Sequence, residues 1–395
     1  METFAAPAPL GFAQRLPGLD LLRAVAICWV MLYHASLFGL DSQDFWIVRF
    51  GWMGVDLFFA LSGFLIAGQL LRPFALGLAP NYPRFFVRRW LRTVPAYLVV
   101  VGLYFLVPAV RERPNLQPLW QFLTFTENLF IAPPLPKAFS QVWSLCVEEQ
   151  FYILLPAVVA VLAIRPSPAK IIGAAVAVLL LGMALRGFLW LHDVARTPFD
   201  IAATPAPAAF MRLIYWPTWS RLDGLLAGVA AATIRTFRPR LWAGLTASPN
   251  MLLAVGIVGV GVSASLFQVQ VAGFAPTVFS FPLLALSMAL IVTAGSESRS
   301  LIGRRAIPGA ALLASGAYSL YLTHKAVFAA TQKALAHAPA PVQSAGLTIA
   351  LLAAFAAGAA LYGLVERPFL KLRDRVGGPS LSSRAAAIPT PIIAQ

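Results

Sequence analysis

Charged residues are scarce in this sequence. Asp, Glu, Lys and Arg make up only 11% of its 395 residues, whereas about 25% is usual for a soluble protein. Hydrophobic residues account for 59%, and the mean hydropathy is +0.77. This balance excludes an ordinary soluble domain and indicates a polytopic membrane protein, whose length counts spans rather than domains.

Cysteine is nearly absent too. Cys28 lies within the first apolar run and Cys146 in a polar approach to a later one, so we expect two unpaired thiols and no disulfide framework. Gly-rich phosphate loops, zinc-type Cys/His spacings and HExxH motifs do not occur. We therefore expect no metal.

Long apolar runs, by contrast, recur along the whole chain. About 20 mostly apolar residues suffice to cross a bilayer as a helix. Such runs predict an all-α, polytopic transmembrane helix bundle of about ten spans. The spans are expected near residues 18–38, 52–71, 93–110, 149–164, 170–191, 212–232, 250–268, 276–294, 310–332 and 344–365.

The basic residues predict the orientation of these spans. The net charge of +15 does not by itself indicate a nucleic-acid partner, because Lys and Arg in a membrane protein mainly mark cytoplasmic loops. With the N-terminus inside, the cytoplasmic segments hold most of these residues. We therefore predict cytoplasmic termini, with a segment at 1–17, a transmembrane domain at 18–375 and a disordered tail at 376–395.

The first span, Gly18 to Phe38, carries ionisable groups despite its apolar character. Each such group costs at least about 2.5 kcal/mol in a membrane and so raises a functional hypothesis. Arg23 and His34 are eleven residues apart, which places them on one helix face, roughly 16 Å apart along the axis. We expect Arg23 near the cytoplasm and His34 toward the outer leaflet.

A pair of acids precedes the predicted fourth span. Glu148 and Glu149 stand where that span enters from the outer side, at about the depth expected for His34. Tyr152 follows Glu148 one turn later on the same face. A carboxylate beside an imidazole holds its tautomer and raises its basicity, as a general base requires. Alternatively, the acids only complement a helix N-terminus.

A group of arginines precedes the predicted third span and has two interpretations. Arg88, Arg89 and Arg92 are interleaved with aromatic residues. Arginine binds phosphate in a bidentate manner. Cytoplasmic anchoring would also explain several of these arginines without a ligand.

Later spans give weaker signals. In the sixth, Arg221 and Asp223 either neutralise each other or serve a site. In the ninth, His324 could take part in catalysis, but we expect it to pack. Three glycines near the second span suit close helix packing: Gly51, Gly54 and Gly63.

Together these blocks resemble the membrane-bound acyltransferase 3 family, often called OafA/YrhL-like. Leu19-Asp20, Arg23 and Tyr33-His34 fit the family's pattern of Arg or Lys, ten residues and His. The later blocks follow in family order over roughly residues 15–375: FFALSGF (58–64), RWLR (89–92) with Pro95, WSL with EEQFY (143–152), SR with DG (220–224), YSLY with His324, and Glu366-Arg367-Pro368.

The resemblance implies a bacterial inner-membrane enzyme. Such proteins take an acyl group, usually acetyl, from cytoplasmic acyl-coenzyme A and place it on hydroxyls of sugars or lipid-linked glycans at the outer side. Some members carry an extra periplasmic esterase-like domain. This chain ends soon after the predicted tenth span, so we expect a transferase domain without that extension.

The resemblance also assigns roles on the donor side. The phosphates of acyl-coenzyme A would bind the cytoplasmic arginines Arg88, Arg89 and Arg92, and Arg23 would guide the arm of the coenzyme.

On the acceptor side, His34 would either deprotonate the hydroxyl or briefly carry the acyl group itself. Glu148 or Glu149 would orient His34, while Tyr152 and Arg221 would stabilise the oxyanion.

Two other classes of protein remain as alternatives. A transporter of a glycan or lipid would also hold intramembrane His, Arg and Asp, but it would not need a phosphate-binding cluster. A non-catalytic membrane sensor would keep the helices and would not turn over acyl-coenzyme A.

Overall fold

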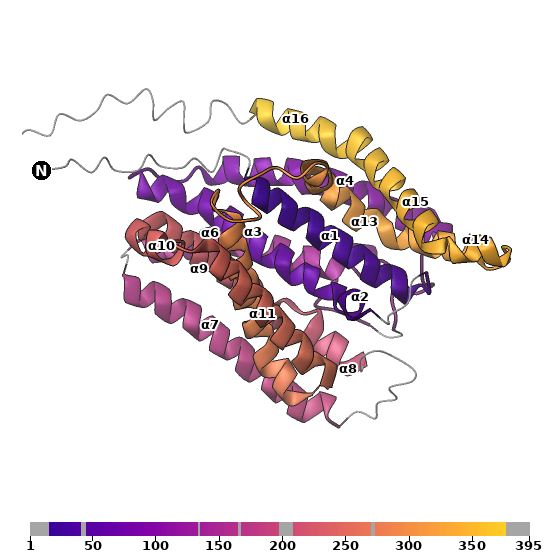
Figure 1. Ribbon diagram of the computed structural model, residues 1–395, viewed down its shortest axis with the longest axis horizontal. Helices are drawn as coiled ribbons and strands as arrows, with labels where there is room; N and C mark the ends of the chain where they lie inside the picture. Colours follow the sequence, from indigo (N-terminus) through magenta and orange to yellow (C-terminus); the bar gives the residue numbers. More distant parts are fainter. Residues whose placement is uncertain are drawn as a thin grey trace, which may run out of the picture.

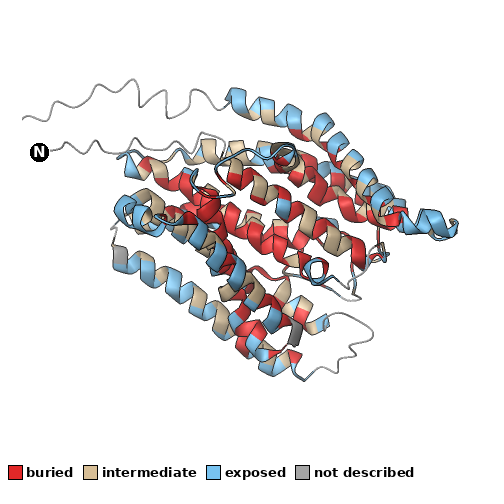
Figure 2. Cartoon of the chain, in the orientation of Figure 1, coloured by how far each residue is buried: buried red, intermediate tan, exposed pale blue. Residues whose placement is uncertain are grey.

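The computed structural model describes residues 16–40, 45–132, 135–164, 167–196, 208–269 and 273–376. The predicted terminal segments lie almost entirely outside these residues. Within the described ranges the chain forms helices and no strand, which confirms the all-α prediction. The long helices lie alongside one another as a bundle (Figure 1), and buried residues concentrate at its centre (Figure 2).

Among the described residues, ten helices form the bundle, and each overlaps one predicted span. They are α1 (Pro17–Leu37), α3 (Gly54–Ala75), α4 (Tyr82–Leu106), α6 (Val142–Ile164), α7 (Pro168–Leu189), α9 (Asp223–Phe237), α11 (Pro249–Val269), α12 (Phe281–Gly295), α13 (Ala310–Leu335) and α15 (Gly346–Leu361).

Shorter elements connect or extend these helices. The α-helical ones are α2 (Trp46–Arg49), α5 (Leu119–Leu123), α8 (Ala208–Phe210), α10 (Pro239–Leu245), α14 (Ala340–Ser344) and α16 (Arg367–Val376). Three are 3₁₀ turns: η1 (Gly51–Met53), η2 (Pro108–Val110) and η5 (Thr218–Ser220). Four are π-helical: η3 (Trp190–Val194), η4 (Met211–Tyr215), η6 (Pro276–Ser280) and η7 (Tyr362–Glu366).

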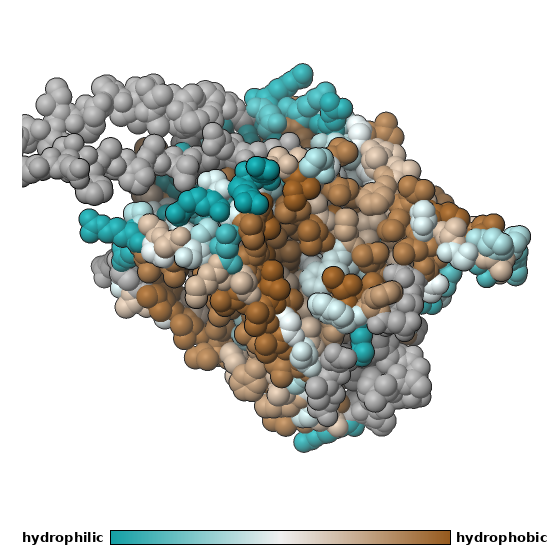
Figure 3. Space-filling model, in the orientation of Figure 1, coloured by the Kyte–Doolittle hydropathy of each residue, from teal (hydrophilic) through white to brown (hydrophobic). Residues whose placement is uncertain are grey.

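In the described part of the chain, seven helical stretches are long and apolar enough to cross a membrane. They contain α1, α3, α6, α7, α11, α12 and α15. Apolar side chains cover most of the middle of the face in Figure 3, and hydrophilic ones gather toward its ends. The chain is therefore a multi-pass membrane protein. The count of ten spans and the cytoplasmic termini stay predictions.

The other three bundle helices, α4, α9 and α13, carry charged residues in the bundle interior. Asp223 of α9 and Lys325 of α13 are buried, and Arg89 of α4 contacts a buried acid. Such residues lower the hydropathy of a helix. Inside a bundle they are tolerated because neighbouring helices supply partners for them.

Two helices begin well before the spans that hydropathy predicted. The Asn81 side chain accepts a hydrogen bond from the Arg84 N–H at 2.9 Å, and α4 begins directly after this cap, at Tyr82 rather than near 93. The helix α6 begins at Val142 rather than near 149. The arginines of α4 and the acids of α6 therefore lie about two turns inside their helices.

Glycines bring the central helix α3 close to its neighbours. A Cβ atom on Gly63 would lie 2.1 Å from the carbonyl oxygen of Leu225 in α9. On Gly51 and Gly54 it would lie 2.2 and 2.7 Å from backbone oxygens of α1. These contacts confirm the prediction of close packing. They fix α3, one wall of the site, against α1 and α9.

Candidate active site

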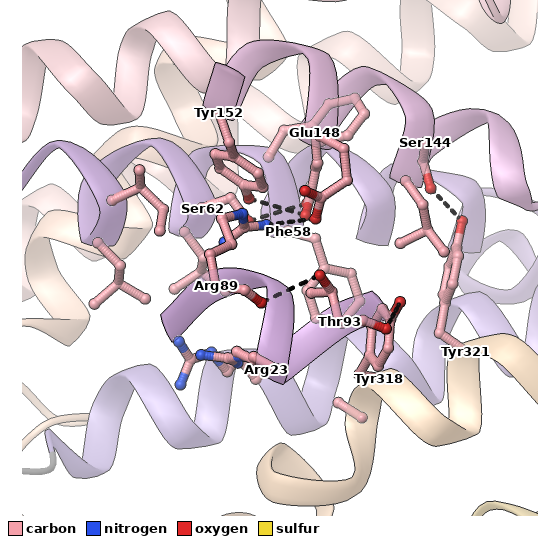
Figure 4. A pocket seen from close by; sticks show the side chains of 18 of the residues that line it. Arg23, Phe58, Ser62, Arg89, Thr93, Ser144, Glu148, Tyr152, Tyr318 and Tyr321 are labelled. Atoms are coloured by element: carbon pink, nitrogen blue, oxygen red, sulfur yellow. Dashed lines mark hydrogen bonds and ion pairs between the residues drawn. The ribbon is translucent and has the colours of Figure 1, made fainter. Parts of the chain in front are cut away.

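A cavity of about 150 Å³ lies inside the bundle between α1, α3, α4, α6 and α13. Apolar side chains such as Phe58 form part of its wall (Figure 4). Its polar lining gathers most of the residues that the sequence singled out, from five separate helices: Arg23, Ser62, Gln69, Arg89, Arg92, Thr93, Ser144, Glu148, Glu149, Tyr152, Ser315, Tyr318 and Tyr321.

An ion pair and a hydrogen-bonded acid form one wall of the cavity. Arg89 Nη2 lies 3.1 Å from Glu149 Oε1, and the Arg89 guanidinium carbon lies 3.1 Å from the centre of the Tyr152 ring. The Tyr152 hydroxyl donates to Glu148 Oε2 at 2.9 Å, and Ser62 Oγ donates to the other Glu148 oxygen at 3.0 Å. Figure 4 shows the side chains of Ser62, Arg89, Glu148 and Tyr152 converging on one point.

This pairing corrects the depths expected from the sequence. Arg89 was expected at the cytoplasmic surface and Glu149 at the outer entrance. Each is instead the eighth residue of its helix, about 10 Å from the helix start. Long side chains then bring the guanidinium and the carboxylate together in the bundle interior.

The expected contact between His34 and the two acids is wrong. No hydrogen bond or ion pair joins His34 to Glu148 or Glu149 among the described contacts. His34 Nδ1 instead lies 2.9 Å from Nε2 of His324, and the ring centres are 4.9 Å apart. His324 is fully buried, whereas His34 is only partly buried.

His324 is thus a site residue that the sequence interpretation underrated. A usable signal was present: the chain has only four histidines, and His324 follows the cavity residues Tyr318 and Tyr321 at helical spacing. An imidazole on a second buried span is a natural partner for one on the first.

Tyr321 and Ser144 lie between the cavity and the histidine pair. Both line the cavity, and their hydroxyl oxygens are 2.6 Å apart. The Tyr321 ring centre is 5.8 Å from that of His324, which follows it by three residues on α13. The cavity therefore ends about one helical turn from the two imidazoles.

Three of the four predicted donor-binding arginines line the cavity. Arg92 lines the cavity and is also exposed, so it lies at the mouth of the cavity. Arg23 also lies 3.6 Å from Asp20, one turn earlier. Arg88 points elsewhere, since its Nη2 lies 3.5 Å from Asp374 of α16. The geometry thus does not support Arg88 as a residue of this cavity.

Arg221 lies apart from the cavity. Its Nη2 lies 2.8 Å from Asp56 Oδ1, and its guanidinium carbon lies 4.2 and 4.8 Å from the ring centres of Phe281 and Tyr215. Asp223 pairs with Arg186 at 2.6 Å, so the idea that Arg221 and Asp223 neutralise each other is wrong. Arg221 holds α3 and α12 together, and the geometry does not support its predicted role at the oxyanion.

A second polar cluster borders the histidine pair and was missed by the sequence interpretation. Lys325 Nζ donates to Ser140 Oγ at 2.5 Å and lies 3.4 Å from Glu112 Oε1. Glu112 also accepts from the Tyr104 hydroxyl at 2.9 Å. These contacts draw the segment between α4 and α6, which lies outside the predicted spans, into the bundle beside His324.

The same segment holds a buried ion pair. Glu127 and Lys137 contact each other and have no exposed side-chain surface. Burial raises the pKa of Glu127, and the Lys137 ammonium opposes that rise. Two buried charges of opposite sign fix the segment in place, because removing either would leave the other without a partner.

The fold and the cavity define a class: a helical membrane protein with a buried polar site and a histidine pair beside it. Residues 16–363 match the acyltransferase 3 family, described as "Acyltransferase domain". The chain belongs to this family, which confirms the resemblance seen in the sequence.

Two relatives show what is known of similar chains. The peptidoglycan O-acetyltransferase OatA of Listeria monocytogenes serovar 1/2a is 25% identical over 372 residues, which cover 90% of this chain and 56% of the relative. The O-acetyltransferase OatA of Staphylococcus aureus (strain NCTC 8325) is 33% identical over 186 residues, 43% of this chain and 29% of the relative. The chain thus spans about half the length of the first relative. No solved structure matches it.

Proposed function

We propose that the protein is an integral membrane O-acyltransferase. It moves an acyl group, acetyl by the names of its relatives, from acyl-coenzyme A to a hydroxyl of a glycan on the outer side of the membrane. Family membership supports the reaction class. The observation that carries the proposal is the cavity, which leads from three arginines to within about one helical turn of the two imidazoles.

The size of the cavity suggests how the donor is held. At about 150 Å³ it is smaller than the roughly 300–1,000 Å³ of pockets that enclose a drug-sized ligand. The cavity would therefore take the extended thioester arm, while the phosphates stay at its mouth with Arg92 and Arg23. Arg89 is engaged by Glu149, so it shapes the wall and adds positive potential.

His34 then acts on the acceptor. Its imidazole removes the proton from the acceptor hydroxyl as the oxygen attacks the thioester carbonyl. The carbon–sulfur bond breaks, and the proton on His34 passes to the departing thiolate of coenzyme A. The Tyr321 and Ser144 hydroxyls border the path and would stabilise the oxyanion once they turn from the Gln141 carbonyl, which accepts from both in the resting structure.

A covalent variant uses the same residues. His34 would attack the thioester, carry the acyl group and pass it to the hydroxyl in a second step. General-base assistance is worth about 10²–10⁴-fold. A much larger loss on removing the imidazole would favour the covalent route.

Release of coenzyme A tests the proposal. Purified protein in detergent receives labelled acetyl-coenzyme A with and without soluble peptidoglycan fragments. An acyltransferase releases coenzyme A faster with acceptor and labels the fragments. A transporter or a sensor does neither, and that result would reject the proposed function.

A further inference from the structure

We infer that His324 is a positioning residue that fixes the tautomer of His34. The inference deepens the proposed function, since its chemical consequence rests on it. The tautomer itself is a property of the resting protein and can be measured without any substrate.

The argument starts at the backbone of α13. His324 Nδ1 lies 2.9 Å from the carbonyl oxygen of Leu320, one turn earlier. A carbonyl oxygen only accepts hydrogen bonds, so Nδ1 must carry the hydrogen. The ring is fully buried, and its described hydrogen-bond partners include no carboxylate to balance a positive charge. The imidazole is therefore neutral, and its other nitrogen, Nε2, is an acceptor.

Two acceptors bear on the state of the second ring, because the Val30 carbonyl one turn earlier on α1 also contacts the His34 imidazole. His34 Nδ1 lies 2.9 Å from Nε2 of His324. Two lone pairs facing each other would repel, so His34 Nδ1 must carry the hydrogen and donate it. The lone pair of His34 is then on Nε2. That nitrogen is the one left to accept a proton from a hydroxyl.

The surroundings of the two rings fit this division of roles. His324 is fully buried and packs against Phe328, with ring centres 5.7 Å apart, and against Tyr321. It has no open side from which to meet a substrate. His34 is less enclosed, since part of the residue remains accessible.

The arrangement replaces the carboxylate that orients histidine in acyl-transfer triads. A buried carboxylate in a membrane carries a high desolvation cost. A chain from the Leu320 carbonyl through His324 to His34 fixes the same tautomer with neutral groups, on a rigid helix that packs along α1 (Figure 1).

Nitrogen NMR of the resting protein tests the tautomer directly. The chain has four histidines, so ¹⁵N-histidine labelling in detergent gives few signals. His34 should carry hydrogen on Nδ1. In His324→Leu the Nε2–H form should gain population, because only the Val30 carbonyl then remains as a partner of the ring. In His324→Gln the Nδ1–H form should stay, because the amide oxygen replaces the acceptor. The control His192→Gln removes a histidine that is 58% exposed and should leave His34 unchanged.

Wild-type His34 with its hydrogen on Nε2 would overturn the inference, even if His324→Leu does not fold. So would an unchanged His34 tautomer in a folded His324→Leu.

Kinetics test the consequence. If His324 orients the base, His324→Leu lowers kcat by about 10²-fold or more, a loss within the range of general-base help, and leaves KM for acyl-coenzyme A nearly unchanged. His324→Gln recovers most of kcat. Equal losses in the Leu and Gln variants would contradict a positioning role. Absence of transfer by the wild type would instead reject the proposed function and leave the NMR result standing.

Discussion

Neighbouring arginines on α4 offer a matched test of how the site is built. Arg89 pairs with Glu149, and the two side chains are 10% and 8% exposed. Arg88, the residue before it, pairs with Asp374, and these side chains are 39% and 59% exposed. The pairs differ in burial, and Arg89 also stacks on the Tyr152 ring, so replacing each arginine with Gln compares a buried, packed site with an exposed one.

The expected magnitudes differ clearly. Removing one partner of a buried ion pair costs about 3–5 kcal/mol, because the other charge stays buried without compensation. An exposed pair contributes at most about 1 kcal/mol. Arg89→Gln should therefore lower the free energy of unfolding several times more than Arg88→Gln. The double variant Arg89→Gln/Glu149→Gln should recover part of the loss, since it removes the charge that Glu149 alone would leave unpaired.

Titration with SDS in mixed micelles, followed by circular dichroism, gives the free energy of unfolding of each variant. The reasoning would be refuted if Arg88→Gln and Arg89→Gln cost the same. It would also fail if the double variant lost as much free energy of unfolding as Arg89→Gln and Glu149→Gln lose together as single variants. The two charges would then act independently.

Two further predictions concern packing and topology. Gly63→Ala should destabilise the protein by at least about 1–3 kcal/mol, because its Cβ meets the Leu225 carbonyl. Gly102→Ala on α4 should not, because nothing lies within 4 Å of its Cβ, and thermal unfolding in detergent compares the two. Reporter fusions after Arg304 and Arg111 should report the cytoplasm and the outer side, and a cytoplasmic signal after Arg111 would contradict the predicted orientation.

Hydropathy was enough to predict the helical membrane fold, because a spanning helix needs about 20 apolar residues wherever it lies in the bundle. It was a poor guide to where α4 and α6 begin. Apolar windows mark the part of a helix that faces lipid or core, whereas the Asn81 cap starts α4 at Tyr82, eleven residues before the predicted start at 93. For that reason the predicted depths of Arg89 and Glu149 in the bundle were wrong.

The sequence also left open which side chains pair with each other across the bundle. Helical spacing correctly put Arg23 and His34 on one helix, but the partners of His34 depend on how α1 turns toward α13 rather than α6. Likewise, Arg221 pairs with Asp56, 165 positions away, instead of with its near neighbour Asp223. Side chains that meet across a bundle are set by helix rotation and crossing, which no local pattern records.

The most direct test of the proposed acyltransferase is transfer by His34 variants in proteoliposomes. Labelled acetyl-coenzyme A and peptidoglycan fragments are supplied on opposite sides, and acetylated fragments are counted. Wild type and His192→Gln should label the acceptor, while His34→Asn, which keeps hydrogen bonding but cannot take up a proton, should lose about 10²–10⁴-fold. Full activity of well-inserted His34→Asn would contradict the central role of this imidazole.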